Sequence, residues 1–270
     1  MALRALEIGA VDVFTQPALN VTEDLSAMQL DLTSRIRAAA KIDLNTIRSV
    51  QTLNNQKPAA KTTQAMGQTT HQILAIAAST GGTEALKVVL NQLPPDLPGT
   101  VIVQHMPPVF TTAFANNLNR ICAFDVREAQ DGDRLTPGLA LIAPGNFHME
   151  LSRSGAYCYV KLHQEPTLHG VRPAADYLMK SVARIAGKNA IGLVLTGMGR
   201  DGADGLLEMR KAGARTFAQD EASSVVYGMP KVAAEVGAVE YVLGLDDIAT
   251  ALMGEFRRRA WNFSGSLDHA

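Results

Sequence analysis

Short apolar runs alternate with amphipathic stretches between residues 71 and 255, which predicts strands that alternate with helices. The apolar runs have the length of strands and few polar positions, as is typical of strands buried on both faces of a sheet. The stretches between them carry apolar residues at helical spacing and end near glycine or proline. We therefore expect an α/β fold with a doubly wound, mostly parallel sheet and helices on both faces. The runs that predict the main strands are 73–78, 100–104, 191–196, 216–219 and 239–243.

Two further segments complete this region. Residues 124–162 carry shorter strand patterns separated by turn signals, and we expect them to supply an antiparallel hairpin at one edge of the sheet. Arg172-Pro173 is predicted to start a helix that runs to Gly187, because proline is favoured in the first turn of a helix and glycine just after its last.

The chain before residue 71 does not continue this alternation. Residues 1–20 show the end of a helix and a short strand, too little to fold alone, so we expect the C-terminal remnant of another domain. Residues 21–70 combine apolar positions at helical spacing with a polar stretch, which predicts a helical segment and a flexible linker. Residues 71–255 form the main predicted domain, and 256–270 a polar tail.

Composition limits the class of protein. The formal net charge of −1 gives no reason to expect a nucleic acid or an anionic membrane surface as partner. Cys122 and Cys158 are too few for a disulfide scaffold and lack metal-ligand spacing. The sequence has no signal-peptide pattern and no apolar run near the roughly 18 residues of a membrane span. We expect a reduced, soluble, cytoplasmic protein without membrane insertion.

The most informative stretch is 73–82, where an apolar run stops at Ser79 and two glycines follow before a helical pattern begins. A strand, a tight turn and a helix in this order place the Ser79 hydroxyl at the carboxyl end of a buried strand. Backbone N–H groups at the start of the helix can hold negative charge there. The alternative is a helix-capping loop without chemistry.

Two other polar residues follow buried strands in the same way, His105 after 100–104 and Asp201 shortly after 191–196. Because the carboxyl ends of parallel strands lie along one edge of a sheet, we expect these residues to converge with Ser79. A serine hydroxyl needs a histidine to take its proton, and a carboxylate to orient that histidine and stabilise its charged form. As structural alternatives, His105 can be a hydrogen-bonded core histidine and Asp201 a helix N-cap.

An oxyanion would need backbone donors beside this serine. The N–H of Thr80 follows the nucleophile, and the N–H of Met198 lies in a glycine-flanked loop whose backbone can approach closely. Arg172 is a speculative contact for a substrate carbonyl or carboxylate, although its spacing of four residues to Asp176 equally predicts a local ion pair.

The strongest rival interpretation uses the glycines around Asp201. Residues 197–202 match G-x-G-x-x-G between a strand and a helix, and Asp220 ends the next strand, which together predict a dinucleotide site. Against this, the charge of Asp201 would repel a pyrophosphate at the helix start. A binding module without catalysis is the other alternative. His148, His163 and His169 match no metal template, so we expect neither a metal nor a cofactor.

Six segments, taken in their order along the chain, carry a family resemblance: Ile76–Ala85, Gln104–Pro108, Ile142–Gly145, His148–Leu151, Leu195–Ala203 and Ala218–Ser223. The sequence resembles the chemotaxis protein-glutamate methylesterases, CheB, over nearly all of residues 71–253. The resemblance implies that residues 71–255 are the catalytic domain and that the family's catalytic serine, histidine and aspartate correspond to Ser79, His105 and Asp201.

The resemblance also implies an activity and partners. The expected reaction is hydrolysis of glutamate γ-methyl esters on the cytoplasmic helices of methyl-accepting chemotaxis receptors with release of methanol, together with deamidation of receptor glutamines. Leu6–Pro17 resembles the last strand region of a response-regulator receiver, with Gln16 in place of the usual lysine. A complete receiver would make the chemotaxis histidine kinase a further partner.

Overall fold

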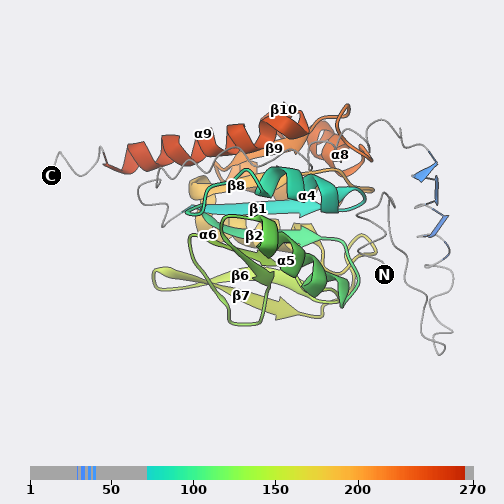
Figure 1. The fold of residues 1–270 in the computed structure, drawn as a ribbon, viewed down its shortest axis with the longest axis horizontal. Coiled ribbons are helices and arrows are strands. Elements are labelled where there is room, and N and C mark those ends of the chain that lie inside the picture. The colour runs from blue at the N-terminus through green and yellow to red at the C-terminus, as the bar shows by residue number, and fades with distance from the viewer. Residues whose placement is uncertain (1–28, 30–31, 34–35, 38, 41–71, 265–270) are drawn as a thin grey trace.

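The computed structural model describes residues 72–264, with isolated residues between 29 and 40 (29, 32–33, 36–37 and 39–40). The domain remnant expected at 1–20 and almost all of the segment expected at 21–70 lie outside the described residues. Figure 1 shows a central sheet with helices on both faces, and the long helix α9 along one side. No helix within the described part of the chain is both long and apolar enough to span a bilayer.

The main sheet of the described region is parallel throughout, with the strand order β10-β9-β8-β1-β2-β5-β3. The chain builds outward from β1 in one direction and later returns to extend the sheet in the other, so the order reverses beside β1. A doubly wound sheet binds its ligands at such a reversal, outside the carboxyl ends of the strands. The strands are β1 (Ile73–Ala78), β2 (Gly99–Gln104), β3 (Asp125–Glu128), β5 (Leu139–Ile142), β8 (Ala190–Val194), β9 (Arg215–Gln219) and β10 (Tyr241–Leu243).

Helices cover both faces of this sheet, as the apolar pattern predicts. Alternate residues of β1 enter different cores: Leu74 and Ile76 pack under α4, α5 and α9, whereas Ala75 and Ala77 pack under α6, α7 and α8. All four of these side chains are completely buried. The helices are α4 (Gly82–Leu90), α5 (Phe110–Ile121), α6 (Ala175–Ala186), α7 (Ala203–Lys211), α8 (Met229–Glu235) and α9 (Leu245–Ser264), with a short 3₁₀ helix η1 (Gly187–Asn189) after α6.

The predicted antiparallel hairpin is present but belongs to a separate sheet. Strands β6 (His148–Ser154) and β7 (Tyr157–His163) pair with each other, and β4 (Arg134–Leu135) pairs with β7. Figure 1 places this small sheet beside the main one, on the side away from α9. The expectation for 124–162 was wrong in one respect, because β3 and β5 join the main sheet in parallel. Val126 and Leu141 are buried there, so a position in the main sheet removes their apolar surface from water.

The start of helix α6 differs from the predicted one. Helix α6 begins at Ala175 rather than at Arg172-Pro173, a cis peptide, and Ala174 before it has extended backbone angles. The helix starts where its first free N–H groups meet a carboxylate, that of Asp201. Helix α9 continues to Ser264, and Phe256 is fully buried in the core.

Candidate active site

Ser79 follows β1, the strand at which the sheet order reverses. Its N–H donates to the Thr196 carbonyl after β8 (3.0 Å), and its own carbonyl accepts from Gly82 N–H at the start of α4 (2.7 Å). Gly81 makes this turn possible with φ 79°, a left-handed conformation that suits glycine. The local sequence therefore exposes a half-buried serine at the edge where α4 begins.

Gln104 joins this serine to the neighbouring strand, and sequence reasoning missed it. Its side-chain amide donates to the carbonyl oxygens of Ser79 (3.0 Å) and His105 (3.2 Å). Gln104 pairs with Ala78 in the β1–β2 register, and His105 N–H donates to the Ala78 carbonyl (3.1 Å). Ser79 and His105 thus leave two adjacent parallel strands at the same level. The available signal was a glutamine inside an otherwise apolar buried strand.

His105 and Asp201 form a buried pair. The Nε2 atom of His105 lies 2.8 Å from Oδ2 of Asp201, and the two side chains are 6% and 3% exposed. Since Nε2 faces the carboxylate, Nδ1 is the ring nitrogen left for a serine hydroxyl. Among the described residues, the structure has no hydrogen bond between the Ser79 hydroxyl and this ring, so their contact remains a prediction.

The Asp201 carboxylate is well supplied with donors. Oδ2 also accepts from the N–H of Ala175 (2.5 Å), and Oδ1 accepts from the N–H of Asp176 (3.1 Å). Burial raises the pKa of Asp201, but the hydrogen bond and charge of His105 and these N–H groups outweigh burial and hold the pKa below its usual range. Asp201 is thus a buried anion that orients His105. The two N–H groups that complete it carry no signal in the sequence.

The loop after β8 lies directly against Ser79. A Cβ on Gly197 would come 2.7 Å from Cβ of Ser79, so only glycine allows this approach. Thr196 fixes the loop, because its hydroxyl donates to the Thr80 carbonyl (3.0 Å) and its N–H donates to the Gln219 side chain (2.8 Å). Thr80 follows Ser79 in the chain and Met198 follows Gly197, and the role of their N–H groups as oxyanion donors stays a prediction.

Arg172 does not form the local ion pair with Asp176, so that alternative is wrong. Its guanidinium instead donates to Oδ1 of Asn146 (3.1 and 2.7 Å) and to the carbonyls of Gln164 (3.2 Å) and Glu165 (3.0 Å). These bonds tie the loop after β5 to the loop after β7. A role of Arg172 in substrate binding stays a prediction.

The glycine motif does not have the side-chain arrangement that a dinucleotide needs. The Asp201 carboxylate occupies the space between the starts of α6 and α7 and bonds His105. Oδ1 of Asp220, the acid expected to bind a ribose, accepts from the N–H (3.0 Å) and hydroxyl (2.6 Å) of Ser223. Both acids are thus engaged within the protein.

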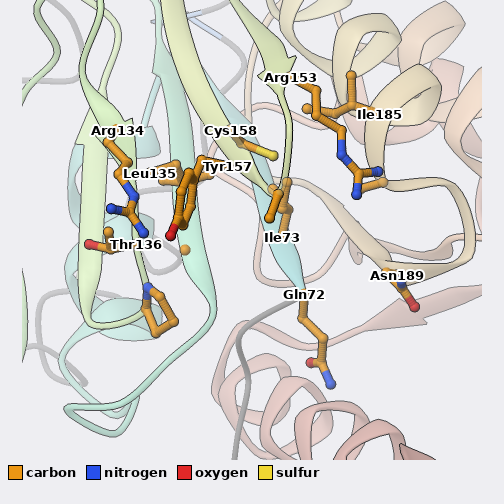
Figure 2. Close-up of a pocket in the computed structure, with 14 residues that line it drawn as sticks. Gln72, Ile73, Arg134, Leu135, Thr136, Arg153, Tyr157, Cys158, Ile185 and Asn189 are labelled. Atoms are coloured by element: carbon orange, nitrogen blue, oxygen red, sulfur yellow. The ribbon is translucent and has the colours of Figure 1, made fainter.

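A pocket of about 220 Å³ lies at the opposite end of the strands from Ser79, where β1 and β2 begin. Figure 2 shows Arg134 and Tyr157 on one side of it, and Arg153 with Ile185 on the other. Ile73, the first residue of β1, is in its lining, whereas Ser79 follows the last. The pocket is therefore separate from the candidate active site.

The fold and this geometry define a class, an α/β enzyme with the residues of a serine hydrolase gathered at the carboxyl edge of its sheet. The CheB methylesterase family model matches residues 74–252. The chain is 55% identical over 258 residues to a protein-glutamate methylesterase/protein-glutamine glutaminase from Bdellovibrio bacteriovorus, covering 95% of this chain and 73% of the relative. A similarly named protein from Pseudomonas aeruginosa is 48% identical over 257 residues, covering 95% and 72%.

A solved structure agrees with these relatives. The crystal structure of the Thermotoga maritima CheB methylesterase catalytic domain superposes with a TM-score of 0.67 at 37% sequence identity, covering 68% of this chain and 97% of that one. The chain belongs to the CheB methylesterase family. It is a hydrolase of protein-glutamate methyl esters and a protein-glutamine glutaminase, in a family that acts on chemotaxis receptors.

Proposed function

We propose that Ser79, His105 and Asp201 perform the hydrolysis as one catalytic unit. The observation that carries this proposal is the buried His105–Asp201 pair (2.8 Å), whose two residues come after β2 and β8, the strands on either side of β1. Ser79 Oγ attacks the ester carbonyl carbon while Nδ1 of His105 accepts the hydroxyl proton. Methanol then leaves with that proton, and water activated by His105 hydrolyses the acyl-enzyme at Ser79.

Asp201 sets the tautomer for this reaction. Its carboxylate accepts a hydrogen bond from the Nε2–H group, which keeps the proton on Nε2 and leaves Nδ1 unprotonated and able to act as a base. When His105 takes the serine proton, the adjacent carboxylate stabilises the imidazolium. Because Asp201 is buried and held by N–H groups of α6, it is available for this role without reorganisation.

The backbone N–H groups of Thr80 and Met198 are proposed to hold the oxyanion. Thr80 directly follows the nucleophile and precedes Gly81, the N-cap of α4, while Met198 follows Gly197, whose backbone lies against Ser79. Each such donor is typically worth on the order of 10²–10³ in rate. The same steps deamidate a glutamine, with ammonia as the leaving group in place of methanol.

The substrate is proposed to be a glutamate side chain on the cytoplasmic helices of methyl-accepting chemotaxis receptors, which would place the enzyme in the cytoplasm. Ser79 is half-buried at an edge of the sheet, so a side chain that projects from a protein helix can reach it. Arg172 is the proposed substrate contact on the neighbouring loops. A complete receiver domain would add the chemotaxis histidine kinase as a partner.

Methanol release from membranes that carry a radiomethylated receptor tests this proposal. Wild-type protein should release labelled methanol, and Ser79→Ala should release none above background while unfolding at the wild-type temperature. Full activity of Ser79→Ala would remove serine catalysis.

A further inference from the structure

A second histidine–carboxylate pair lies directly behind Asp201. The Asp176 side chain is completely buried, and its Oδ2 lies 2.8 Å from Nε2 of His169. Ligand-type atoms of His169, Asp176 and Asp201 all lie within 4.8 Å of one another. The arrangement repeats the geometry of His105 and Asp201, also 2.8 Å apart. The family comparison does not assign a role to this second pair.

The two aspartates cap each other's helices. Asp201, which precedes α7, accepts from the N–H groups of Ala175 and Asp176 in the first turn of α6. Asp176 in turn accepts at Oδ1 from the N–H of Gly205 in the first turn of α7 (2.6 Å). First-turn N–H groups have no partner within their own helix, so each carboxylate satisfies donors of the other helix. Movement of Asp176 would therefore move the helix start that carries Asp201.

Gly205 makes this reciprocal contact possible. A Cβ at this position would come 2.7 Å from Cβ of Met179 and 3.2 Å from Cα of Asp176. Glycine within a helix costs roughly 0.5–1 kcal/mol relative to alanine. The close approach of α6 and α7 that it permits brings the N–H of Gly205 within reach of the Asp176 carboxylate.

His169 is presented by a tight turn. Leu168 and Val171 exchange backbone hydrogen bonds (3.2 and 3.0 Å), and the two residues between them, His169 and Gly170, have φ values of 55° and 77°. Positive φ at both central positions is the geometry of a type I′ turn. The His169 side chain is 24% exposed, so it covers the buried Asp176 on its solvent side.

The charged form of the Asp176 carboxylate depends on its hydrogen-bond donors. Burial raises its pKa, and the charge of Asp201 raises it further, while the bonds from Gly205 and His169 oppose these effects. Two carboxylates at this separation repel, and without donors one of them takes up a proton. A protonated Asp176 would no longer be a pure acceptor for the two groups that fix its position. The other titratable groups that act on these carboxylates are His105, His148 and Lys180.

We propose that Asp176 and His169 are positioning residues that hold Asp201 in the orientation that bonds His105. The inference rests on the proposed function, because it assigns these residues a role only through Asp201. Neither residue contacts the ester in this mechanism. Their removal should therefore lower kcat and leave KM unchanged.

The test compares removal of a side chain with replacement by its amide counterpart. Asp176→Ala deletes both acceptors, whereas Asp176→Asn keeps an oxygen for Gly205 N–H and can donate to an unprotonated Nε2 of His169. In the same way, His169→Ala deletes the donor to Asp176, whereas His169→Gln keeps one. Asp133→Ala is the matched control, because Asp133 also bonds a cation, Arg127, and a backbone N–H, beside an edge strand of the sheet.

Three quantities are measured for each variant: kcat and KM for methanol release from radiomethylated receptor membranes, the downfield proton resonance of the His105–Asp201 hydrogen bond, and the unfolding temperature. A displacement of about 1 Å at a catalytic group can cost about 10²-fold in rate. We expect Asp176→Ala to lose about 10- to 100-fold in kcat and to lose the resonance. Asp176→Asn should stay within about threefold of wild type and keep the resonance.

Other outcomes overturn the inference. Wild-type kcat and an intact resonance in Asp176→Ala, as expected for Asp133→Ala, would show that Asp201 needs no such support. A loss of kcat with an unchanged resonance, or without rescue by asparagine, would also reject positioning. If Asp176→Ala does not fold, the contrast between His169→Ala and His169→Gln decides by the same criteria. Ser79→Ala in the same assay separates the positioning proposal from the proposed mechanism. Activity of Ser79→Ala would refute the mechanism itself, whereas the outcomes above refute the positioning only.

Discussion

Replacement of Asp201 by asparagine perturbs the proposed unit at its orienting group with little change in volume. The carboxylate accepts three hydrogen bonds, two at Oδ2 from His105 and Ala175 and one at Oδ1 from Asp176. An amide has only one oxygen, so its NH₂ group must face at least one of these donors. A buried donor left unsatisfied costs about 1–3 kcal/mol, which sets the expected loss of stability.

Either orientation of the new amide impairs catalysis. With the NH₂ group toward Nε2, His105 must protonate Nδ1 and can no longer accept the proton of Ser79. With the oxygen toward Nε2, the bond survives, but the negative charge that stabilises the imidazolium is gone. Loss of an orienting aspartate in a serine triad costs about 10⁴-fold in kcat, or about 5 kcal/mol in activation free energy.

The assay is methanol release from radiomethylated receptor membranes, together with thermal unfolding. Asp204→Asn is the matched control, because Asp204 is an exposed aspartate on α7 that pairs with Arg200. It should keep wild-type kcat. A kcat of Asp201→Asn within tenfold of wild type would refute the orienting role that the contacts of Asp201 support.

Three further predictions concern single features of the structure. Gly197→Ala places a Cβ 2.7 Å from Cβ of Ser79, so the serine must shift and kcat should fall about 10- to 100-fold. Methanol release measures kcat, and circular dichroism shows that the variant still folds. The pKa of Asp201 is lowered in the folded state, so its contribution to stability is complete above about pH 4 and is lost as the pH falls below that value. Urea unfolding from pH 6 to pH 3 should therefore show a steeper loss of unfolding free energy for wild type than for Asp201→Asn. Partial burial raises the pKa of Cys122 to about 12, so at pH 8 the folded protein should leave Cys122 largely unmodified by iodoacetamide. Peptide mass spectra measure this, and rapid modification would contradict the raised pKa.

The sequence predicted the parts of the site that depend on strand ends. Ser79 and His105 each follow a buried apolar run, and parallel pairing places the ends of neighbouring strands at one level. The expected convergence of His105 with Asp201 is confirmed by their 2.8 Å contact. These inferences succeeded because periodicity and glycine punctuation are local signals, while the parallel sheet converts local position into spatial position.

The remaining features depend on contacts between elements, which local pattern does not contain. Asp176 gave a plausible local ion pair with Arg172, yet its partners are His169 and the N–H of Gly205, brought together by the packing of α6 on α7. Helix α6 starts later than Pro173 because its first N–H groups are bound by Asp201, in another element. Gln104 was missed because one glutamine before a histidine matches no motif. Short strands with glycine turns also resemble hairpins, which is why β3 and β5 were misplaced.

The central claim is that Ser79 and Asp201, which lie far apart in the sequence, act as one catalytic unit through His105. Methanol release by Ser79→Ala, Asp201→Ala and the double variant measures this directly, because residues that act as a unit have strongly non-additive effects. If the three residues form such a unit, the double variant is no slower than Ser79→Ala alone. Losses that multiply in the double variant would contradict the claim.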